Sequence, residues 1–246
     1  MTSAAETSAD GSAVTQDYLK AVWAASEWGG KGASITGLAR RMGVAPSTAS
    51  ENVARLVEAG LLEHVPYRAV TLSERGRRLA QGMVRRHRLL ETYLVEALGF
   101  EWDEVHAEAE VLEHAVSDRL LAALDAALGH PVRDPHGDPI PTADGSVIVP
   151  ELRCVDTLTV GQSGVVGRIK DDPDVLKQLS CAGIGLDTRV IVAGRSGGGS
   201  NAENTPVRTV VRALDGDASV QDAPDVVVPA SSLWLLEHRG AVKRPQ

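Results

Sequence analysis

The spacing of apolar residues changes once along this chain, near Glu151. Before this point apolar side chains recur every three or four residues, which is the period of an amphipathic helix. After it, short apolar runs alternate with Gly and Asp clusters, as in strands joined by turns. Residues 129–145, just before this change, are rich in Pro, Gly and Asp and mark a domain boundary. We therefore expect a multidomain α+β chain, with helices first and a small β-barrel-like module last.

Three helices and a hairpin are predicted before residue 73. Apolar spacing, capping residues and glycines place the helices at 15–28, 36–42 and 47–59, and short strands at 61–65 and 69–72. Two helices joined by a tight turn and followed by a hairpin are typical of a winged helix-turn-helix, which places its second helix in the DNA major groove. A purely structural helical hairpin is the alternative.

The net charge around the predicted winged helix-turn-helix favours DNA binding over a purely structural role. Residues 34–90 hold ten Arg and four Glu, a net charge of +6, although the whole chain carries −8. A local positive surplus attracts the phosphate backbone. The residues expected to contact bases or phosphates are Ser47, Thr48, Ser50, Glu51 and Asn52 at the start of the third helix, and Arg68 in the wing.

The sign of the charge reverses in the next stretch. Residues 91–125 hold ten Asp or Glu and one Arg, a net charge of −9. A basic block followed by an acidic one indicates two sites, one for a polyanion and one for cations. The elements predicted from here on are helices at 73–98, 103–117 and 118–128, strands at 157–160, 164–169, 189–193, 207–213 and 225–228, and a helical turn at 174–180.

One face of the second of these helices carries His106, Glu110, Glu113 and His114. No Lys or Arg lies within residues 102–117 to neutralise it, and like charges one turn apart repel by roughly 0.2–0.5 kcal/mol per pair. A divalent cation would remove this repulsion, and carboxylates with imidazoles are suitable ligands. A merely solvated acidic face is the alternative.

A second pair with ligand spacing is His87 and Glu91, one turn apart on the preceding helix. If the two helices pack together, His106 can join this pair. Alone the pair is weak support, because histidines on core helices are often merely hydrogen-bonded. The other histidines have no partner at ligand spacing and are assigned no function: His64, His130, His136 and His238.

Together these segments resemble the diphtheria-toxin-repressor family (DtxR/IdeR) of metal-dependent transcriptional regulators, in its manganese-sensing MntR branch. The resemblance covers nearly the whole chain after the first residues. It is carried by TQDYL at 15–19, PSTASENVARL at 46–56, LSERG at 72–76, RHRLLE at 86–91, the His/Glu helix through Asp118, and PHGDPIP at 135–141.

The resemblance implies a division of the chain and two metal sites. The expected parts are a disordered tail at 1–13, a winged helix-turn-helix DNA-binding domain at 14–76, a helical metal-binding and dimerisation domain with its linker at 77–145, and an SH3-like (FeoA-like) β-barrel at 150–240. A homodimer on palindromic double-stranded operator DNA is implied, with metal as corepressor. The implied primary site is Asp17, Glu110, Glu113 and His114. The implied ancillary site is His87, Glu91 and His106 with a ligand from the loop 171–173, where the alignment favours Asp172.

The chemistry of the ligands selects the metal. Asp17 and Glu110 stand where iron-sensing members carry Met and Cys, and hard oxygen donors favour Mn(II). Mn(II) is thus the expected cofactor, Fe(II) is the alternative, and Co(II) or Zn(II) are expected to substitute in vitro. Lys20 stands where two-manganese members carry Glu, which argues for separate sites. Asp134 and Asp138 replace the Ser and Asn that contact an anion in iron-dependent members, so no such contact is expected.

Two other classes of function have less support. Residues 194–198 match the G-x-S-x-G pattern of serine hydrolases, but that motif needs a helix directly after its serine, and here a flexible loop is predicted. No enzyme activity and no small organic substrate are therefore expected. A metal carrier would explain the acidic block and leave the arginine-rich winged helix unexplained.

The remaining features of the sequence bear on where in the cell the protein acts. No apolar run approaches 18 residues, so no membrane partner is expected. The first thirteen residues lack the basic start and apolar core of a signal peptide. Cys154 and Cys181 are too few for a disulfide scaffold, and free thiols suit the cytoplasm.

Overall fold

A computed structural model describes residues 12–65, 67–196, 208–214 and 224–237. Within it the chain forms two compact units, each assembled from several segments. The first unit comprises Met1–His87, Val111–Ala122 and Pro141–Val147. The second comprises Arg88–Glu110, Ala123–Ile140 and Ile148–Gln246.

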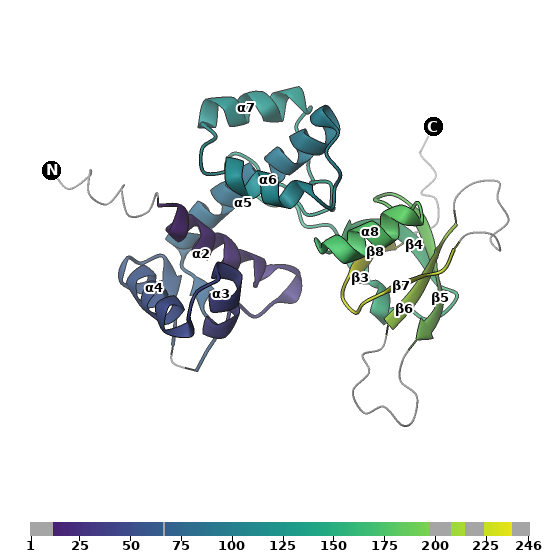
Figure 1. The fold of residues 1–246 in the computed structure, drawn as a ribbon, viewed down its shortest axis with the longest axis horizontal. Helices are drawn as coiled ribbons and strands as arrows, with labels where there is room; N and C mark the ends of the chain where they lie inside the picture. The colour runs from purple at the N-terminus through teal and green to yellow at the C-terminus, as the bar shows by residue number, and fades with distance from the viewer. Residues whose placement is uncertain (1–11, 66, 197–207, 215–223, 238–246) are drawn as a thin grey trace, which may run out of the picture. The chain divides into compact units, whose positions relative to one another are not determined.

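The N-terminal part is a small helical domain with a hairpin (Figure 1). Its elements are helix α2 (Ala13–Ala24), a 3₁₀ turn (Glu27–Gly29), α3 (Ile35–Met42), α4 (Pro46–Glu58), β1 (Leu62–Glu63) and β2 (Thr71–Leu72). The two strands pair antiparallel, with Leu62 opposite Leu72. This arrangement confirms the predicted winged helix-turn-helix, with shorter strands than expected.

Capping and turn residues set the bounds of these helices. The Ser12 hydroxyl caps α2 by accepting from the Thr15 backbone N at 3.3 Å, so the helix begins earlier than predicted. Gly43 ends α3 with φ +64°, a left-handed conformation that favours glycine. Pro46 occupies the first turn of α4, where its missing N–H costs no hydrogen bond, and Ser47 lies inside the helix instead of capping it.

One apolar core holds this domain together. Tyr18, Leu19 and Val22 of α2 are 0–1% exposed, and they pack with Leu38 of α3 and Val53 of α4. Each such side chain contributes roughly 1.5–3 kcal/mol when fully buried. The core therefore fixes the orientation of α4, whose polar first turn is left in solvent.

Three helices follow: α5 (Glu74–Leu98), α6 (Val105–Leu112) and α7 (Asp118–Ala127). Ser73 caps α5, since its hydroxyl accepts from the Gly76 backbone N at 3.0 Å. Helix α6 is shorter than predicted, so Glu113 and His114 lie just after its last residue. Within α5, Leu90 and Leu94 are buried, whereas Leu79 and Leu98 are 37% and 57% exposed.

The C-terminal part is a six-stranded antiparallel sheet in the order β3-β8-β4-β5-β6-β7 (Figure 1). Its strands are β3 (Leu152–Cys154), β4 (Ser163–Ile169), β5 (Arg189–Ser196), β6 (Arg208–Ala213), β7 (Val226–Val228) and β8 (Leu233–Glu237). Helix α8 (Pro173–Cys181) packs its Leu176 and Leu179 into the core of this sheet. Strands β3 and β8 were not predicted, and a 3₁₀ turn (Val155–Thr157) precedes a loop where a strand at 157–160 was expected.

The segment 129–145 is more than a linker. Residues 134 and 136–141 are buried, and the His136 carbonyl accepts from the Ile169 backbone N at 2.8 Å. Gly137 has φ +90°, and a Cβ there would lie 2.2 Å from the carbonyl oxygen of Gly167. The two backbones are therefore in direct contact, and the segment is attached to strand β4.

Candidate metal centres and DNA-binding surface

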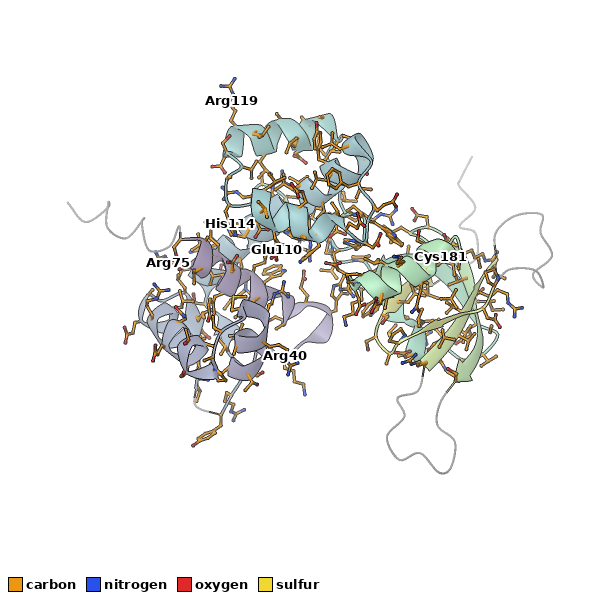
Figure 2. All side chains as sticks on the ribbon, in the orientation of Figure 1. Arg40, Arg75, Glu110, His114, Arg119 and Cys181 are labelled. Atoms are coloured by element: carbon orange, nitrogen blue, oxygen red, sulfur yellow. The ribbon has the colours of Figure 1, made fainter. Side chains whose placement is uncertain are left out.

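Three of the predicted ligands converge in the first unit. Asp17 comes from α2, and Glu113 and His114 follow α6; each offers a ligand atom within 4.8 Å of the others. His114 Nε2 lies 3.1 Å from Asp17 Oδ1 and 3.6 Å from Glu113 Oε1. The other ring nitrogen of His114 lies 2.8 Å from the Gln16 side-chain oxygen, which only accepts. Nε2 is therefore the ring atom of His114 that faces the two carboxylates (His114 is labelled in Figure 2).

A lysine of α2 reaches the same cluster. Lys20 Nζ lies 2.5 Å from Glu113 Oε1, and His87 Nδ1 lies 2.6 Å from Glu113 Oε2. Burial acts to raise the pKa of Glu113, but the His87 hydrogen bond and the charges of His87 and Lys20 outweigh it, so this pKa is lowered. The expectation that nothing basic neutralises this face is thus wrong at Glu113. The convergence of three donors remains as the support for a metal there.

A second group of donors lies in the second unit. His106 Nδ1 is 3.1 Å from Glu91 Oε1 and 2.8 Å from Asp171 Oδ2, and His106 Nε2 is 3.4 Å from Glu110 Oε1. Glu110, predicted in the primary site, is therefore placed beside His106. Burial acts to lower the pKa of His106, but hydrogen bonds to Asp171, Glu110 and Glu91 raise it to about 11. A protonated ring thus supplies the positive charge that these three carboxylates require.

The loop before α8 contributes a different aspartate from the one expected. Asp172 caps α8, where its Oδ1 accepts from the Val175 backbone N at 3.4 Å. Asp171 contacts His106 instead. The structure therefore favours Asp171 over Asp172 as the donor from the C-terminal part.

One histidine assigned no function from the sequence lies in this second group. His136 is 1% exposed, and it offers a ligand atom within 4.8 Å of donors from Glu91 and Asp171. Ligand spacing within one helix could not reveal it, because the three residues come from three different segments. The only signal in the sequence was its place within the PHGDPIP motif of the family resemblance.

The two aspartates beside His136 are bound by arginines. Arg88 Nε lies 3.5 Å from Asp134 Oδ2, and Arg168 pairs with Asp138. Burial raises the pKa of Asp134 to about 7, and the charges of Asp138 and Glu91 act in the same direction. These side chains hold the segment in place by buried ion pairs.

The predicted DNA-contacting residues form a polar surface at the start of α4. Ser47, Thr48, Ser50 and Glu51 are exposed, and so is Arg68 in the hairpin. Asn52 is half-buried; its amide donates to the Thr48 carbonyl at 3.0 Å and accepts from Arg55 at 3.1 Å. The surface thus presents small hydroxyl groups and cations, which suit phosphates and base edges.

The remaining residues singled out from the sequence have other surroundings. Ser196 of the hydrolase-like motif is the last residue of β5, and the residues after it lie outside the described part of the chain. His130 lies 2.9 Å from Asp125 at the protein surface. The tail before residue 12 and His238 also lie outside the described residues.

Comparison with known proteins points to one family. Residues 10–70 match the family model of the iron-dependent repressor N-terminal DNA-binding domain, and residues 73–142 match that of the iron-dependent repressor metal-binding and dimerisation domain. The iron-dependent repressor IdeR of Mycobacterium tuberculosis is 33% identical over 202 residues, covering 75% of this chain and 86% of its own length.

Solved structures of manganese regulators are similar to this fold. A structure described as a manganese-dependent transcriptional repressor in complex with manganese is 48% identical, with a TM-score of 0.78 over 90% of this chain and 98% of its own. The manganese regulator SloR is 26% identical, with a TM-score of 0.71 over 90% of this chain and 97% of its own.

Proposed function

The chain belongs to the iron-dependent repressor family of metal-dependent transcriptional repressors, and we propose that it is a Mn(II)-dependent member that binds palindromic operator DNA as a homodimer. The observation that carries this proposal is the convergence of Asp17, Glu113 and His114. Asp17 belongs to the first helix of the DNA-binding domain, whereas the other two follow α6.

A ligand set drawn from both segments couples metal binding to conformation. Asp17, Glu113 and His114 would hold the ion, which supplies the positive charge that keeps α2 beside the turn after α6. A cation that prefers this arrangement shifts the population towards it, and DNA that prefers it must strengthen metal binding by the same factor. Neutralising carboxylates near a DNA-binding domain also reduces their repulsion of phosphates.

The donor atoms support Mn(II) as the metal. Asp17, Glu113, Glu91 and Asp171 offer oxygen, and the histidines offer imidazole nitrogen; neither cluster contains a sulfur donor. Oxygen-rich sites suit Mn(II), whereas thiolates and thioethers favour softer metals. Fe(II) is the alternative, since the relative IdeR of Mycobacterium tuberculosis is named an iron-dependent repressor. Co(II) and Zn(II) are expected to substitute in vitro.

The other features agree with a DNA-bound regulator. The exposed first turn of α4 and Arg68 provide the operator contacts, and the family model over 73–142 includes a dimerisation region. None of the helices in the described part of the chain has the length and apolar character of a membrane span. We propose that the protein acts in the cytoplasm, where chromosomal DNA is accessible.

Binding to operator DNA under a parallel metal titration tests this function. A duplex is first selected from a random pool with the Mn(II)-loaded protein, and its binding is then measured with Mn(II), anaerobic Fe(II), Zn(II) and Co(II) after chelation. We expect tight binding at the lowest free concentration with Mn(II), and weak salt-sensitive binding with none. Equal binding by the chelated protein would overturn metal dependence, and no duplex binding with any metal would favour a carrier.

A further inference from the structure

Helix α4 turns one face to the core and the opposite face to solvent. Ala49, Val53 and Leu56 are only 0–3% exposed and form the inner face. At about 100° per residue, Glu51 lies roughly 160° around the helix from both Ala49 and Val53. Its side chain is exposed, so this carboxylate stands on the face of α4 that points away from the core.

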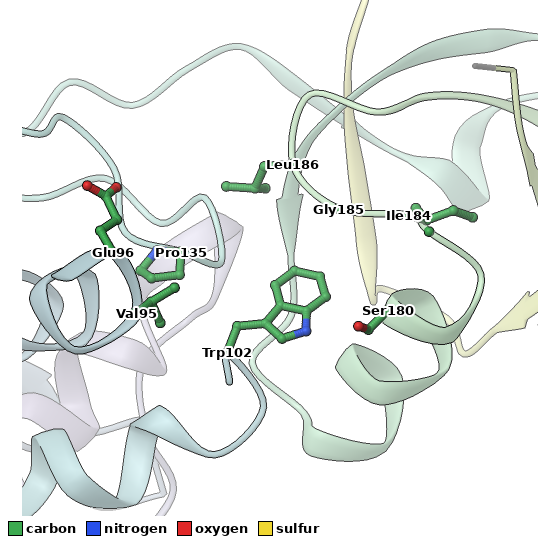
Figure 3. Close-up of a pocket in the computed structure, with 9 residues that line it drawn as sticks. Val95, Glu96, Trp102, Pro135, Ser180, Ile184, Gly185 and Leu186 are labelled. Carbon is green, nitrogen blue, oxygen red and sulfur yellow. The ribbon is translucent and has the colours of Figure 1, made fainter. Parts of the chain in front are cut away.

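The outer face of α4 can enter a groove of its ligand, because its side chains are in solvent. The second unit offers the opposite shape, a hollow of about 400 Å³ lined by Trp102, Pro135 and Ile184, which would enclose a ligand (Figure 3). A recognition helix in the DNA major groove directs the residues of its N-terminal part at the base edges. Glu51 lies in the second turn of α4, within this part.

The other polar side chains at the start of α4 discriminate poorly between bases. The hydroxyls of this surface can donate or accept, so they suit any base. The amide of Asn52 is already used, since it donates to the Thr48 carbonyl at 3.0 Å and accepts from Arg55 at 3.1 Å. Within residues 46–52, Glu51 is thus the one side chain that can only accept a hydrogen bond.

The carboxylate of Glu51 has no protein partner in the described part of the chain. Arg55, one turn further along α4, donates to Asn52 instead. None of the other described residues forms a hydrogen bond or ion pair with Glu51. A negative charge on this surface repels DNA phosphates, so Glu51 weakens DNA binding unless a donor on the DNA compensates.

The major groove offers a carboxylate one well-suited donor, the N4 amino group of cytosine. This group has an acceptor on one side only, the guanine of its own base pair. The N6 amino group of adenine instead lies between two acceptors, N7 of adenine and O4 of thymine, and both repel a carboxylate. Guanine and thymine present no donor there. The chemistry of Glu51 therefore selects cytosine.

We propose that Glu51 is a specificity-determining residue, whose carboxylate accepts a hydrogen bond from N4 of a cytosine in each half-site of the operator. This inference rests on the proposed function, since it requires that DNA binds the outer face of α4. It adds the identity of one base pair. The same charge repels the phosphates of every sequence, so it widens the difference in affinity between the operator and other DNA.

Selection of duplexes from a random pool by the full-length, Mn(II)-loaded protein tests this role. Glu51→Gln adds an amide donor at nearly the same size, and Glu51→Ala removes the acceptor. The matched control is Glu58→Gln, which changes an exposed carboxylate at the last residue of α4. Affinities are then measured for the duplex that the wild type selects and for versions in which each C·G pair in turn becomes T·A. That change puts an acceptor in place of the N4 donor.

The wild type and Glu58→Gln are expected to lose at least about 5-fold in affinity when one particular C·G pair of each half-site is replaced. Glu51→Ala should bind the two versions alike, and it should bind random DNA more tightly than the wild type because a negative charge is gone. Glu51→Gln should prefer adenine at that position, since a glutamine amide pairs with N6 and N7 of adenine.

A base preference that is the same in both Glu51 variants as in the wild type would overturn the inference and leave the proposed function intact. Variants that keep the wild-type circular dichroism spectrum yet bind no duplex would also overturn it, because Glu51 would then support binding in general. A wild-type protein that enriches no duplex would overturn the proposed function itself, and this inference with it.

Discussion

Lys20 Nζ lies 2.5 Å from Oε1 of Glu113, and both side chains are almost completely buried. The lysine comes from α2 and the glutamate follows α6, so their ion pair joins the same two segments as the Asp17, Glu113 and His114 cluster. One protein-borne cation thus already occupies part of the space around Glu113, which supports a single metal ion rather than two in this cluster.

Replacing Lys20 by Met should lower the stability of the metal-free protein and increase the stabilisation that it gains from Mn(II). Loss of one partner of a buried ion pair costs about 3–5 kcal/mol, and the value here should lie at the lower end because His87 still contacts Glu113. Mn(II) then no longer competes with a lysine for Oε1. We expect a lower melting temperature in chelator and a larger rise on adding Mn(II), with exposed Lys31→Met as control. An unchanged melting temperature in chelator would show that the pair adds no stability.

Asp17→Ala should abolish metal-dependent operator binding and leave the fold intact. Asp17 is a partly exposed donor 3.1 Å from His114, so its loss removes one ligand without opening the core. Gel-shift titration with Mn(II) and circular dichroism measure the two effects. The matched control is Glu108→Gln, an exposed carboxylate of α6 that should behave as the wild type. A normal Mn(II) response of Asp17→Ala would refute its role as a ligand.

The protonated ring of His106 should make the stability of the metal-free protein depend on pH. Its pKa is raised from 6.5 to about 11 in the fold, so its contribution is fully present below pH 6.5 and is lost as pH rises through 11. In chelator, the difference in melting temperature between wild type and His106→Gln should therefore shrink steadily from pH 6 to pH 9. A difference that is constant or grows over this range contradicts the assigned proton.

Arg68→Ala should weaken binding to all duplexes by a similar factor. An exposed arginine in the wing is expected to contact phosphate, and loss of one phosphate contact lowers the slope of log K against log salt by about 0.9. Measuring affinity at several salt concentrations for selected and random duplexes tests this. Arg119→Ala removes an exposed arginine of α7 and serves as control (Figure 2). Loss of selectivity without a change of slope would instead indicate base contact by Arg68.

The sequence predicted what depends on local spacing. The helix-turn-helix follows from Gly43, Pro46 and the apolar stripes of its helices, and these features act within a few residues of one another. The sequence also predicted the contact between Glu91 and His106, because each residue has a ligand-spaced neighbour on its own helix.

What the sequence could not show were contacts between distant segments. Lys20 is 93 residues from Glu113, so a search for neutralising charges along one helix missed it. His136 lies in an irregular segment, where no period relates one side chain to the next. The choice between Asp171 and Asp172 depended on which of two adjacent aspartates caps α8, and a register read from the family resemblance did not resolve it.

Gly137 is in backbone-to-backbone contact with Gly167, which lies outside the two family-matched segments. The segment that carries His136 is therefore positioned in part by a strand that those two segments do not include. A protein truncated before residue 150 would retain the winged helix and α5 to α7, yet it would lack the strand that His136 rests against. Such a fragment should still recognise DNA sequence while sensing its effector poorly. The C-terminal sheet thus helps to position the segment that carries His136.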